Sequence, residues 1–275
     1  MTSRYEKRFA DIKAKMGKTF MPFTVLGWPD RGASLALIKQ MIDGGASALE
    51  LGFAFSDPVA DGPLIQKADF DTLASGFTVD MALALIAEVR AYDAEIPIGV
   101  LIYYNLILAH GPEKFFQDAR AAGIDGVLVA DLPVDSASEI APFAQANDIA
   151  QIFLVSPVTA DQRLDLITSK ASGFIYLLSR LGVTGTAARS ASSDQTLAAL
   201  VKRIKSRTTV PVIAGFGVSS PSDAAVMFAA GCDGVISGSK IIELAASPDG
   251  AAKLDHFYKA MLAAASYDTE PKALS

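Results

Sequence analysis

The sequence predicts an α/β fold: one (β/α)8 TIM barrel spanning residues 1–275 as a single domain. Short apolar runs rich in β-branched residues alternate with Ala- and Leu-rich segments of helical period. Three segments repeat the same step from a helix-ending glycine into a buried strand: GGASALELG, AGIDGVLVAD and AGCDGVISGS. Eight such units close naturally into a barrel. An open doubly wound sheet is the alternative, but no GxGxxG motif follows the first apolar run.

An extra helix is expected before the first strand, in MTSRYEKRFADIKAKMGK. Ser3 and Glu6 have the spacing of a capping box. Four apolar residues recur on one helical face: Tyr5, Phe9, Ile12 and Met16. Because the segment is charged throughout and has no apolar core, it does not resemble a secretory signal.

Eight strands are predicted, each from one apolar run: residues 20–26, 48–52, 97–102, 126–130, 150–155, 173–178, 211–215 and 233–237. Helices are expected between them, for example at 34–45, 113–123 and 222–231, and the last two should end at a glycine. Extended loops are expected after the second and sixth strands, at 53–76 and 179–193, on the face where barrels carry their active sites. The second loop is rich in Gly, Ser, Thr and Ala and is expected to act as a lid, while the tail 267–275 is expected to be flexible.

Charge and composition exclude several functions. The net charge is -6 and no Lys/Arg-rich block occurs, which argues against nucleic acid or an anionic membrane as partner. The single cysteine, Cys232, excludes an intramolecular disulfide, and the two histidines do not provide a metal cluster. That cysteine and histidine usage fits a cytoplasmic origin. The most apolar run, 96–108, is too short to span a bilayer, so a soluble protein is expected.

Glu50 is the first candidate for chemistry, because glutamate is disfavoured inside a strand such as Ala48-Leu49-Glu50-Leu51. Alternation places Ala48 and Glu50 opposite the leucines; if that face points inward, Glu50 lies at the barrel mouth. A partly buried carboxyl there has a raised pKa and can donate and accept a proton near neutrality. The alternative is a salt bridge to a neighbouring strand, but no predicted strand contains Lys or Arg.

A second carboxylate follows in the loop SDPVADGP. Asp57, before Pro58, is expected to form a turn, whereas Asp61 fits either a turn or a catalytic role. Six apolar or aromatic residues near strand ends could line a substrate pocket or simply fill the core: Phe23, Leu101, Leu128, Leu154, Tyr176 and Phe216.

Small, Gly-rich turns follow the last two predicted strands, at AGFGVSSPSD and SGSKIIELA. Barrels often bind phosphate at these two loops through backbone N–H groups. Gly217, Gly238 and Ser239 are the candidates, with Gly185 of the lid closing over them, although glycine also suits tight turns without a ligand. No strand carries the lysine of a Schiff-base aldolase, and no His cluster supports a metal-assisted one. What remains is carboxylate acid/base catalysis, without cofactor or metal, on a phosphorylated and partly apolar substrate.

Four motifs, in this order and spacing, resemble the α subunit of tryptophan synthase over nearly the whole chain: ELGFAFSDPVADGPLIQKA, YLLSRLGVTG, PVIAGFGVSSP and GVISGSKII. The resemblance implies a (β/α)8 lyase that cleaves indole-3-glycerol phosphate to indole and glyceraldehyde 3-phosphate in tryptophan biosynthesis. It implies no cofactor in this chain and a β subunit partner that carries pyridoxal phosphate, in an α2β2 heterotetramer.

The same resemblance assigns roles to residues. It implies that Glu50 is the general acid/base and that Asp61 accepts a hydrogen bond from the indole N–H. Tyr176 would pack beside the substrate, Thr184 and Gly185 would belong to the lid, and phosphate would bind at the glycine-rich turns already described. Two residues depart from the family pattern: Ala54 stands where proline is usual, and Lys240 where a small residue is usual.

The predicted docking surface for the β subunit is one loop: Phe53, Ala54, Phe55, Ser56, Asp57 and Pro58. Two phenylalanines within three residues are more apolar surface than a solvent-facing loop normally has, unless Phe55 packs on its own barrel. Two alternatives to a partner-dependent lyase are a free-standing indole-3-glycerol phosphate lyase and a non-catalytic regulatory subunit. The presence of both carboxylates and both phosphate loops argues against the regulatory subunit.

Overall fold

The chain forms a closed barrel of eight parallel strands in sequence order, in a computed structural model that describes residues 3–59, 61–179 and 191–265. The strands are β1 (Thr19–Val25), β2 (Leu49–Gly52), β3 (Ile98–Ile102), β4 (Gly126–Val129), β5 (Ala150–Val155), β6 (Ile175–Leu178), β7 (Val212–Gly215) and β8 (Gly234–Ser237). The barrel closes where Thr19 of β1 pairs with Gly234 of β8. The predicted barrel is therefore confirmed, and all eight strands lie within two residues of their predicted bounds.

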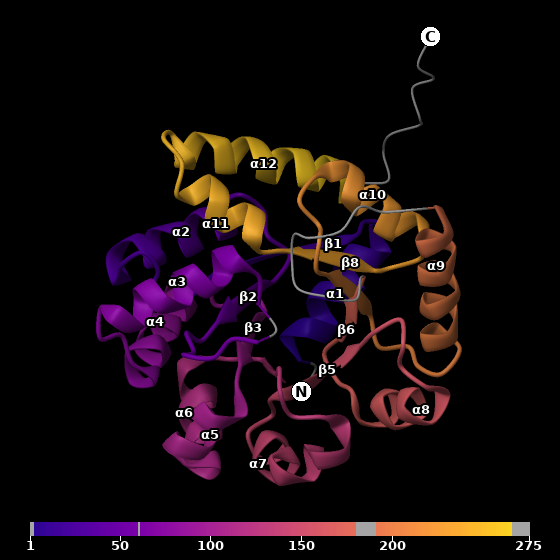
Figure 1. Ribbon diagram of the computed structural model, residues 1–275, viewed down its shortest axis with the longest axis horizontal. Helices are drawn as coiled ribbons and strands as arrows, with labels where there is room; N and C mark the ends of the chain where they lie inside the picture. The colour runs from indigo at the N-terminus through magenta and orange to yellow at the C-terminus, as the bar shows by residue number, and fades with distance from the viewer. Residues whose placement is uncertain (1–2, 60, 180–190, 266–275) are drawn as a thin grey trace.

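Helices surround the strands in a ring (Figure 1). They are α2 (Arg31–Asp43), α3 (Pro63–Ala74), α4 (Val79–Tyr92), α5 (Tyr104–His110), α6 (Pro112–Ala122), α7 (Ala141–Ala146), α8 (Asp161–Lys170), α9 (Ala191–Lys205), α10 (Pro221–Ala229), α11 (Ser239–Ala245) and α12 (Gly250–Ala265), with a 3-10 turn, η1 (Val134–Glu139), before α7; a further helix, α1 (Arg4–Ala14), precedes β1. As expected, α6 ends at a left-handed glycine, Gly123. No single helix in the described ranges is long and apolar enough to cross a membrane; α3 and α4 would reach that length only as a pair bent by 107°.

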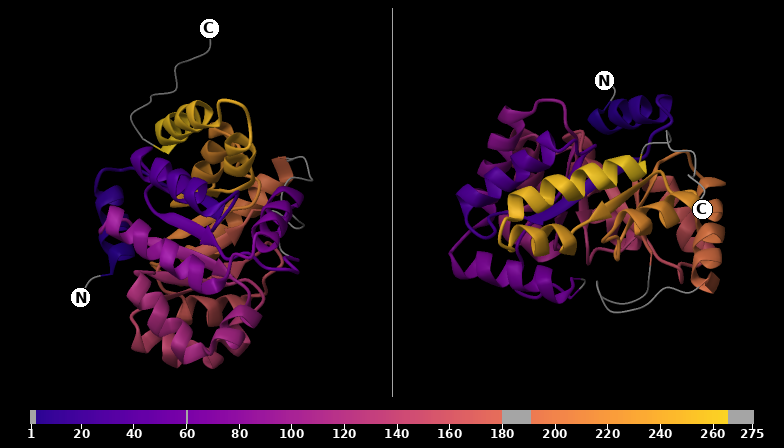
Figure 2. Two further views of the ribbon diagram at one scale, coloured as in Figure 1. Left: turned by 90° about the vertical axis from the view of Figure 1, so that its left-hand side faces the viewer. Right: turned by 90° about the horizontal axis from the view of Figure 1, so that it is seen from above.

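The predicted N-terminal helix, α1, lies across one end of the barrel, as the second view of Figure 2 shows. Its capping box is present, with Ser3 and Glu6 bonded to each other's backbone N–H. Tyr5 is fully buried beneath the barrel, and a Cβ on Gly99 of β3 would lie only 2.5 Å from the Tyr5 hydroxyl. The Tyr5 side chain of α1 thus closes this end of the barrel.

The prediction that Met16 shares the buried face of α1 is wrong. The helix ends at Ala14, and Met16 has a φ of 55° and a side chain 70% exposed. Gly17 donates its N–H to the carbonyl of Ile12, so the chain turns toward β1 before a fourth helical turn can form.

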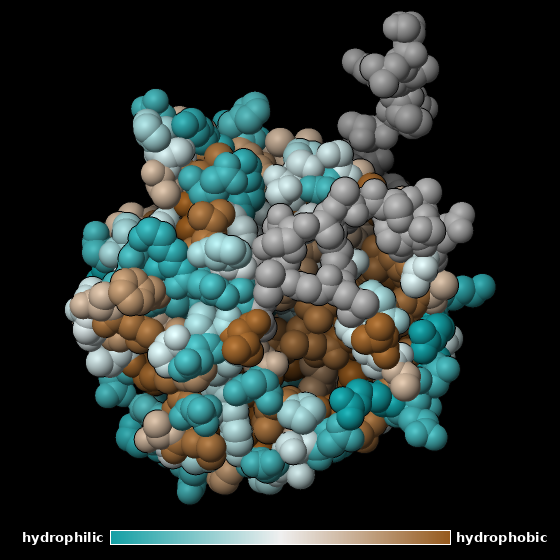
Figure 3. All heavy atoms as spheres, in the orientation of Figure 1, coloured by the Kyte–Doolittle hydropathy of each residue, from teal (hydrophilic) through white to brown (hydrophobic). Residues whose placement is uncertain are grey.

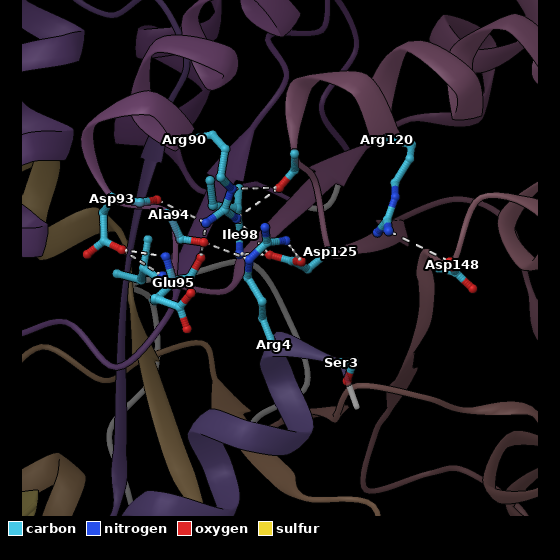
Figure 4. A network of polar contacts seen from close by, with 12 residues as sticks. Ser3, Arg4, Arg90, Asp93, Ala94, Glu95, Ile98, Arg120, Asp125 and Asp148 are labelled. Atoms are coloured by element: carbon cyan, nitrogen blue, oxygen red, sulfur yellow. Dashed lines mark hydrogen bonds and ion pairs between the residues drawn. The ribbon is translucent and has the colours of Figure 1, made fainter. Parts of the chain in front are cut away.

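A buried ion-pair network fastens α1 to the barrel (Figure 4). Asp125, just before β4, accepts hydrogen bonds of 2.8 Å from Arg4 of α1, from Arg90 of α4 and from the backbone N–H of Ile98. Its side chain is 6% exposed, so removal of either arginine would leave a buried charge with fewer partners, a costly arrangement in proteins. The network thus connects α1 to α4 and to the backbone at the start of β3.

The segment after β2 is predicted as an extended loop over 53–76, but the structure differs. Residues 63–74 form helix α3, which begins with Gly62 at the N-cap and Pro63 in the first turn. Its buried residues are Ile65, Ala68, Asp69 and Thr72, and it packs against β1 and α11. The loop itself is therefore short and is held between a strand and a helix. Most of the predicted lid and the predicted flexible tail lie outside the described residues.

Candidate active site

A cavity of about 230 Å³ opens at the carboxyl ends of the strands, the face on which barrel enzymes place their catalytic groups. Its walls are Phe23, Glu50, Asp61, Ile65, Leu101, Tyr176, Phe216, Gly217, Val218, Ser219, Asp223, Ile236, Gly238, Ser239 and Lys240. Figure 3 shows apolar side chains in a hollow near the middle of one face of the molecule. The cavity thus combines carboxylates, aromatic rings and glycine-rich turns in one place.

Most of the sequence-predicted site residues meet in this cavity, including both carboxylates. Leu128 and Leu154 do not line it; they belong to a neighbouring cavity of about 290 Å³ at the ends of β4 and β5. Thr184 and Gly185 lie outside the described residues.

Glu50 lies on β2, beside Phe23 of β1 and Gly99 of β3 in the strand register. Its residue surface is only 2% exposed. Burial raises the pKa of Glu50 to about 8, and the charge of nearby Asp61 adds to the rise. No Lys or Arg within the described part of the chain forms an ion pair with Glu50, so the salt-bridge alternative does not hold there.

Asp61 is also buried, 6% exposed, in the loop between β2 and α3. The Tyr103 hydroxyl donates a hydrogen bond of 3.1 Å to its Oδ2 atom. Burial raises the pKa of Asp61 to about 6, while the Tyr103 hydrogen bond acts in the opposite direction. Near neutral pH, Glu50 is therefore mostly protonated and Asp61 mostly ionised, so one carboxyl can donate a proton while the other holds a negative charge.

Tyr103 and Asp69 are two members of this neighbourhood that the sequence patterns did not identify. Tyr103 is 2% exposed and follows the last residue of β3, the position where barrels present side chains to the active site. Asp69 is 4% exposed on α3. The helical spacing of Ile65, Asp69 and Thr72 is the signal that could have identified a buried face containing a carboxyl.

Aromatic residues form one wall of the cavity. The rings of Tyr176 and Phe216 meet edge to face, with centroids 6.2 Å apart. Burial raises the pKa of Tyr176 well above its usual value, so its hydroxyl stays neutral. Phe216 and Gly217 have φ angles of 66° and 80°, a left-handed turn that is unusual for phenylalanine and brings the backbone after β7 to the cavity.

The glycine-rich turns after β7 and β8 form the polar end. Helix α11 begins at Ser239, and its N-cap, Gly238, offers no side chain to the first backbone N–H groups. A Cβ on Gly238 would lie 2.9 Å from the Phe23 ring, so glycine is needed for this close approach. Lys240 also lines the cavity, and its ammonium group pairs with Glu243 at 2.8 Å. Backbone N–H groups are thus available to an anionic group here.

The predicted docking loop is less exposed than its two phenylalanines indicated. Phe53 is 3% exposed and packs edge to face on Phe115, because its N–H continues the β2–β3 ladder by bonding to Leu101. Phe55 is half-buried and stacks on Tyr103, as the alternative interpretation expected. Asp57 does form the expected turn, since its carbonyl accepts from the N–H of Val59.

Exposed apolar surface occurs instead beside this loop. Val59 is 77% exposed, and Phe70 and Leu73 of α3 are 71% and 37% exposed. They lie together with Pro58 along a groove bordered by the loop and α3. Apolar residues are visible at the surface in the left part of Figure 3, where α3 lies. Apolar patches of this kind are typical of protein-binding surfaces.

A metal-binding cluster of three or more His, Cys, Asp or Glu is not found among residues 3–59, 61–179 and 191–265.

Comparison with known proteins places the chain among relatives of one kind. Residues 9–266 match the family model described as "Tryptophan synthase alpha chain". The chain is 47% identical over 238 residues to the protein of that name from Methanoregula boonei, covering 86% of this chain and 88% of the relative. It is also 47% identical over 228 residues to its namesake from Methanothermobacter thermautotrophicus, covering 83% of each.

Solved structures similar to this chain come from the same family as these relatives. A chain in a structure of Mycobacterium tuberculosis tryptophan synthase superposes with a TM-score of 0.87 and 32% identity, covering 97% of this chain and 99% of the other. Tryptophan synthase subunit alpha from Legionella pneumophila gives 0.86 and 30%, covering 96% and 98%. The motif resemblance is confirmed.

The burial of Glu50 predicts how stability depends on pH. Its folded pKa of about 8 lies above the unfolded value near 4.3, so the folded state retains a proton that the unfolded state releases. The stabilisation is complete below the unfolded pKa and is lost as pH rises through the folded one. We expect the unfolding free energy of wild type, from urea titrations, to fall relative to Glu50→Gln between about pH 5 and about pH 8.

The matched control is Glu88→Gln, because Glu88 is an exposed glutamate paired with Arg31. It measures the effect of replacing an exposed glutamate under the same conditions. A constant difference between wild type and Glu50→Gln would contradict the raised pKa of Glu50.

Proposed function

The chain belongs to the tryptophan synthase alpha chain family, and we propose that Glu50 and Asp61 are the two catalytic carboxylates of its reaction. The enzyme is a carbon–carbon lyase of tryptophan biosynthesis. Its substrate is indole-3-glycerol phosphate, and its products are indole and glyceraldehyde 3-phosphate. One observation supports the assignment above all: two buried carboxyls share one cavity, with pKa values raised to about 8 and about 6.

The first step uses the two protonation states together. Protonated Glu50 donates its proton to C3 of the indole ring, which leaves the positive charge shared with the ring nitrogen. Ionised Asp61 accepts a hydrogen bond from the ring N–H and stabilises that cation. An acid near pKa 8 can donate at neutral pH, and a neighbouring anion lowers the energy of the charge that develops.

The second step returns the proton. Carboxylate Glu50 takes the proton of the glycerol hydroxyl next to the scissile bond as the bond to indole C3 breaks. The electron pair of that bond restores the aromatic indole, and the former carbinol carbon becomes the aldehyde of glyceraldehyde 3-phosphate. Glu50 ends the cycle protonated, so atoms and charges balance without any cofactor in this chain.

We propose that the indole ring packs among Phe23, Leu101 and Tyr176, since these residues line the same cavity as Glu50. The phosphate is proposed to bind backbone N–H groups at Gly217, Gly238 and Ser239.

We further propose that a β subunit, which carries pyridoxal phosphate, docks beside the active site in an α2β2 assembly in the cytoplasm. The docking surface comprises the loop 54–58 together with Val59, Phe70 and Leu73. Its exposed apolar side chains support the proposal. The same loop leads directly to Asp61, so docking and catalysis are coupled through it.

Replacement of Glu50 by glutamine removes the proton carrier while keeping the size and polarity of the side chain. We expect turnover, measured as indole release, to fall by about 10² to 10⁴, as for other lost general acid/base groups, with substrate binding largely retained. Glu88→Gln, at an exposed position, should keep wild-type turnover. Near-normal turnover of Glu50→Gln would exclude Glu50 as the acid/base.

An aspartate at position 70 places a charge in the proposed docking surface. We expect Phe70→Asp to have normal activity alone but to need about tenfold or more β subunit for half-maximal activation, because interface aromatic residues often contribute more than 1 kcal/mol. Met16→Asp is the matched control, since Met16 is equally exposed beside the N-terminal helix. An unchanged β-subunit requirement would exclude this surface. Full activity of wild type alone, unaffected by β subunit, would indicate a free-standing lyase.

A further inference from the structure

Asp69 is a third buried carboxyl near the site, and the proposed chemistry does not use it. It lies on the face of α3 that packs inward and is 4% exposed, but it does not line the substrate cavity. Burial raises the pKa of Asp69 to about 8, and the charge of Asp61 contributes to the rise. At neutral pH the group is therefore mostly a neutral carboxylic acid, which can still accept a hydrogen bond.

The charged groups of the surrounding elements do not neutralise Asp69 in the described structure. On α3 itself, Lys67 pairs with Asp71 at 2.6 Å. On α11, which packs against α3, Lys240 pairs with Glu243 at 2.8 Å. A buried carboxyl without a cation is costly, so its position calls for a physical role.

Three contacts connect Asp69 to Asp61. The backbone N–H of Phe55 interacts with the Asp69 carboxyl closely enough to lower its pKa, against the effect of burial. The Phe55 ring stacks on the Tyr103 ring, with centroids 4.6 Å apart and planes inclined by 17°. The Tyr103 hydroxyl then donates to Asp61 Oδ2 at 3.1 Å. The route runs from helix α3, through the loop, to the proposed catalytic carboxylate.

We propose that Asp69 is a positioning residue for Asp61: it holds the Phe55 backbone, which keeps the Phe55 ring on Tyr103 and the Tyr103 hydroxyl on Asp61. The inference rests on the proposed function of Asp61. In this role Asp69 acts through Phe55 and Tyr103 and does not contact the substrate.

The composition of the loop makes such an anchor important. Ala54 does not restrict its own φ as proline would, so the residue before Phe55 contributes little rigidity. The backbone bonds of Val59 and Asp61 are to Asp57 and Pro58, within the loop itself. Asp69 therefore ties the middle of the loop to a helix, while Gln66 ties its end by donating to the Asp61 carbonyl at 2.9 Å.

Steady-state kinetics of three variants, with saturating β subunit, test the proposal. Asp69→Ala should lower kcat about tenfold with KM nearly unchanged, because Asp69 does not line the substrate cavity. Asp69→Asn should recover most of that loss, since its amide oxygen can accept the same N–H. Asp71→Ala, an aspartate on the outer side of the same helix, should match wild type.

A double-mutant cycle with Tyr103→Phe tests the route. Tyr103→Phe removes the hydroxyl bonded to Asp61, so Asp69→Ala added to it should lower kcat further by no more than about twofold. If Asp69→Ala does not fold, as judged by the fluorescence of the single tryptophan Trp28, Phe55→Leu replaces it in the cycle. This variant removes the stacked ring and leaves α3 intact.

Three outcomes would overturn the inference: a normal kcat for Asp69→Ala, no recovery in Asp69→Asn, or independent effects of Asp69 and Tyr103. The Asp61→Asn variant distinguishes a failure of the positioning role from a failure of the proposed function. An inactive Asp61→Asn with a fully active Asp69→Ala would overturn the positioning role alone. A fully active Asp61→Asn would overturn the catalytic assignment on which it rests.

Discussion

The cost of burying Glu50 beside Asp61 governs the chemistry of this end of the barrel. Two carboxyls in one low-dielectric site disfavour simultaneous ionisation, so the group with the better hydrogen bond ionises first. Asp61 receives that bond from Tyr103, whereas Glu50 lies deeper on a strand. The resulting order places a proton donor and an anion side by side near neutrality. The proposed reaction requires both.

Different parts of the fold hold the two groups. Glu50 is fixed by a strand paired on both sides, in a barrel whose opposite end is closed by Tyr5 and secured by Asp125. Asp61 lies on a short loop held by side-chain contacts from Gln66 of α3 and from Tyr103, which follows β3. The acid is therefore rigidly placed, while the anion depends on the loop that also borders the proposed docking surface. Such an arrangement lets a partner influence the anion without moving the acid.

Sequence patterns predicted the barrel because its strands are buried on both faces and its helices end at glycine or begin with caps. They placed Glu50 correctly because alternation within a strand fixes which face a residue occupies. They assigned Leu128 and Leu154 to the same cavity as Glu50, whereas both line a neighbouring one. Alternation shows which face of a strand a residue occupies, but not which residues of other strands it meets inside a tilted barrel.

Tertiary contacts account for the other differences between the sequence predictions and the structure. Phe53 was expected at the surface, but backbone pairing extends one residue past β2 and buries it. Asp69 was not identified because residues 53–76 are predicted as one loop, although Gly62 and Pro63 mark the start of a helix. The role of Tyr103 depends on a hydroxyl reaching a loop 42 positions away, and no local pattern specifies that contact.

The most direct measurement is a pH titration of the carboxyl carbons by NMR, with ¹³C-labelled glutamate and aspartate in the free enzyme. Spectra of Glu50→Gln and Asp61→Asn would assign the two resonances. The account predicts that Glu50 titrates with a midpoint of about 8 and Asp61 with a midpoint of about 6, so that only Asp61 is ionised at neutral pH. A Glu50 midpoint near the unperturbed value of about 4.3 would contradict it.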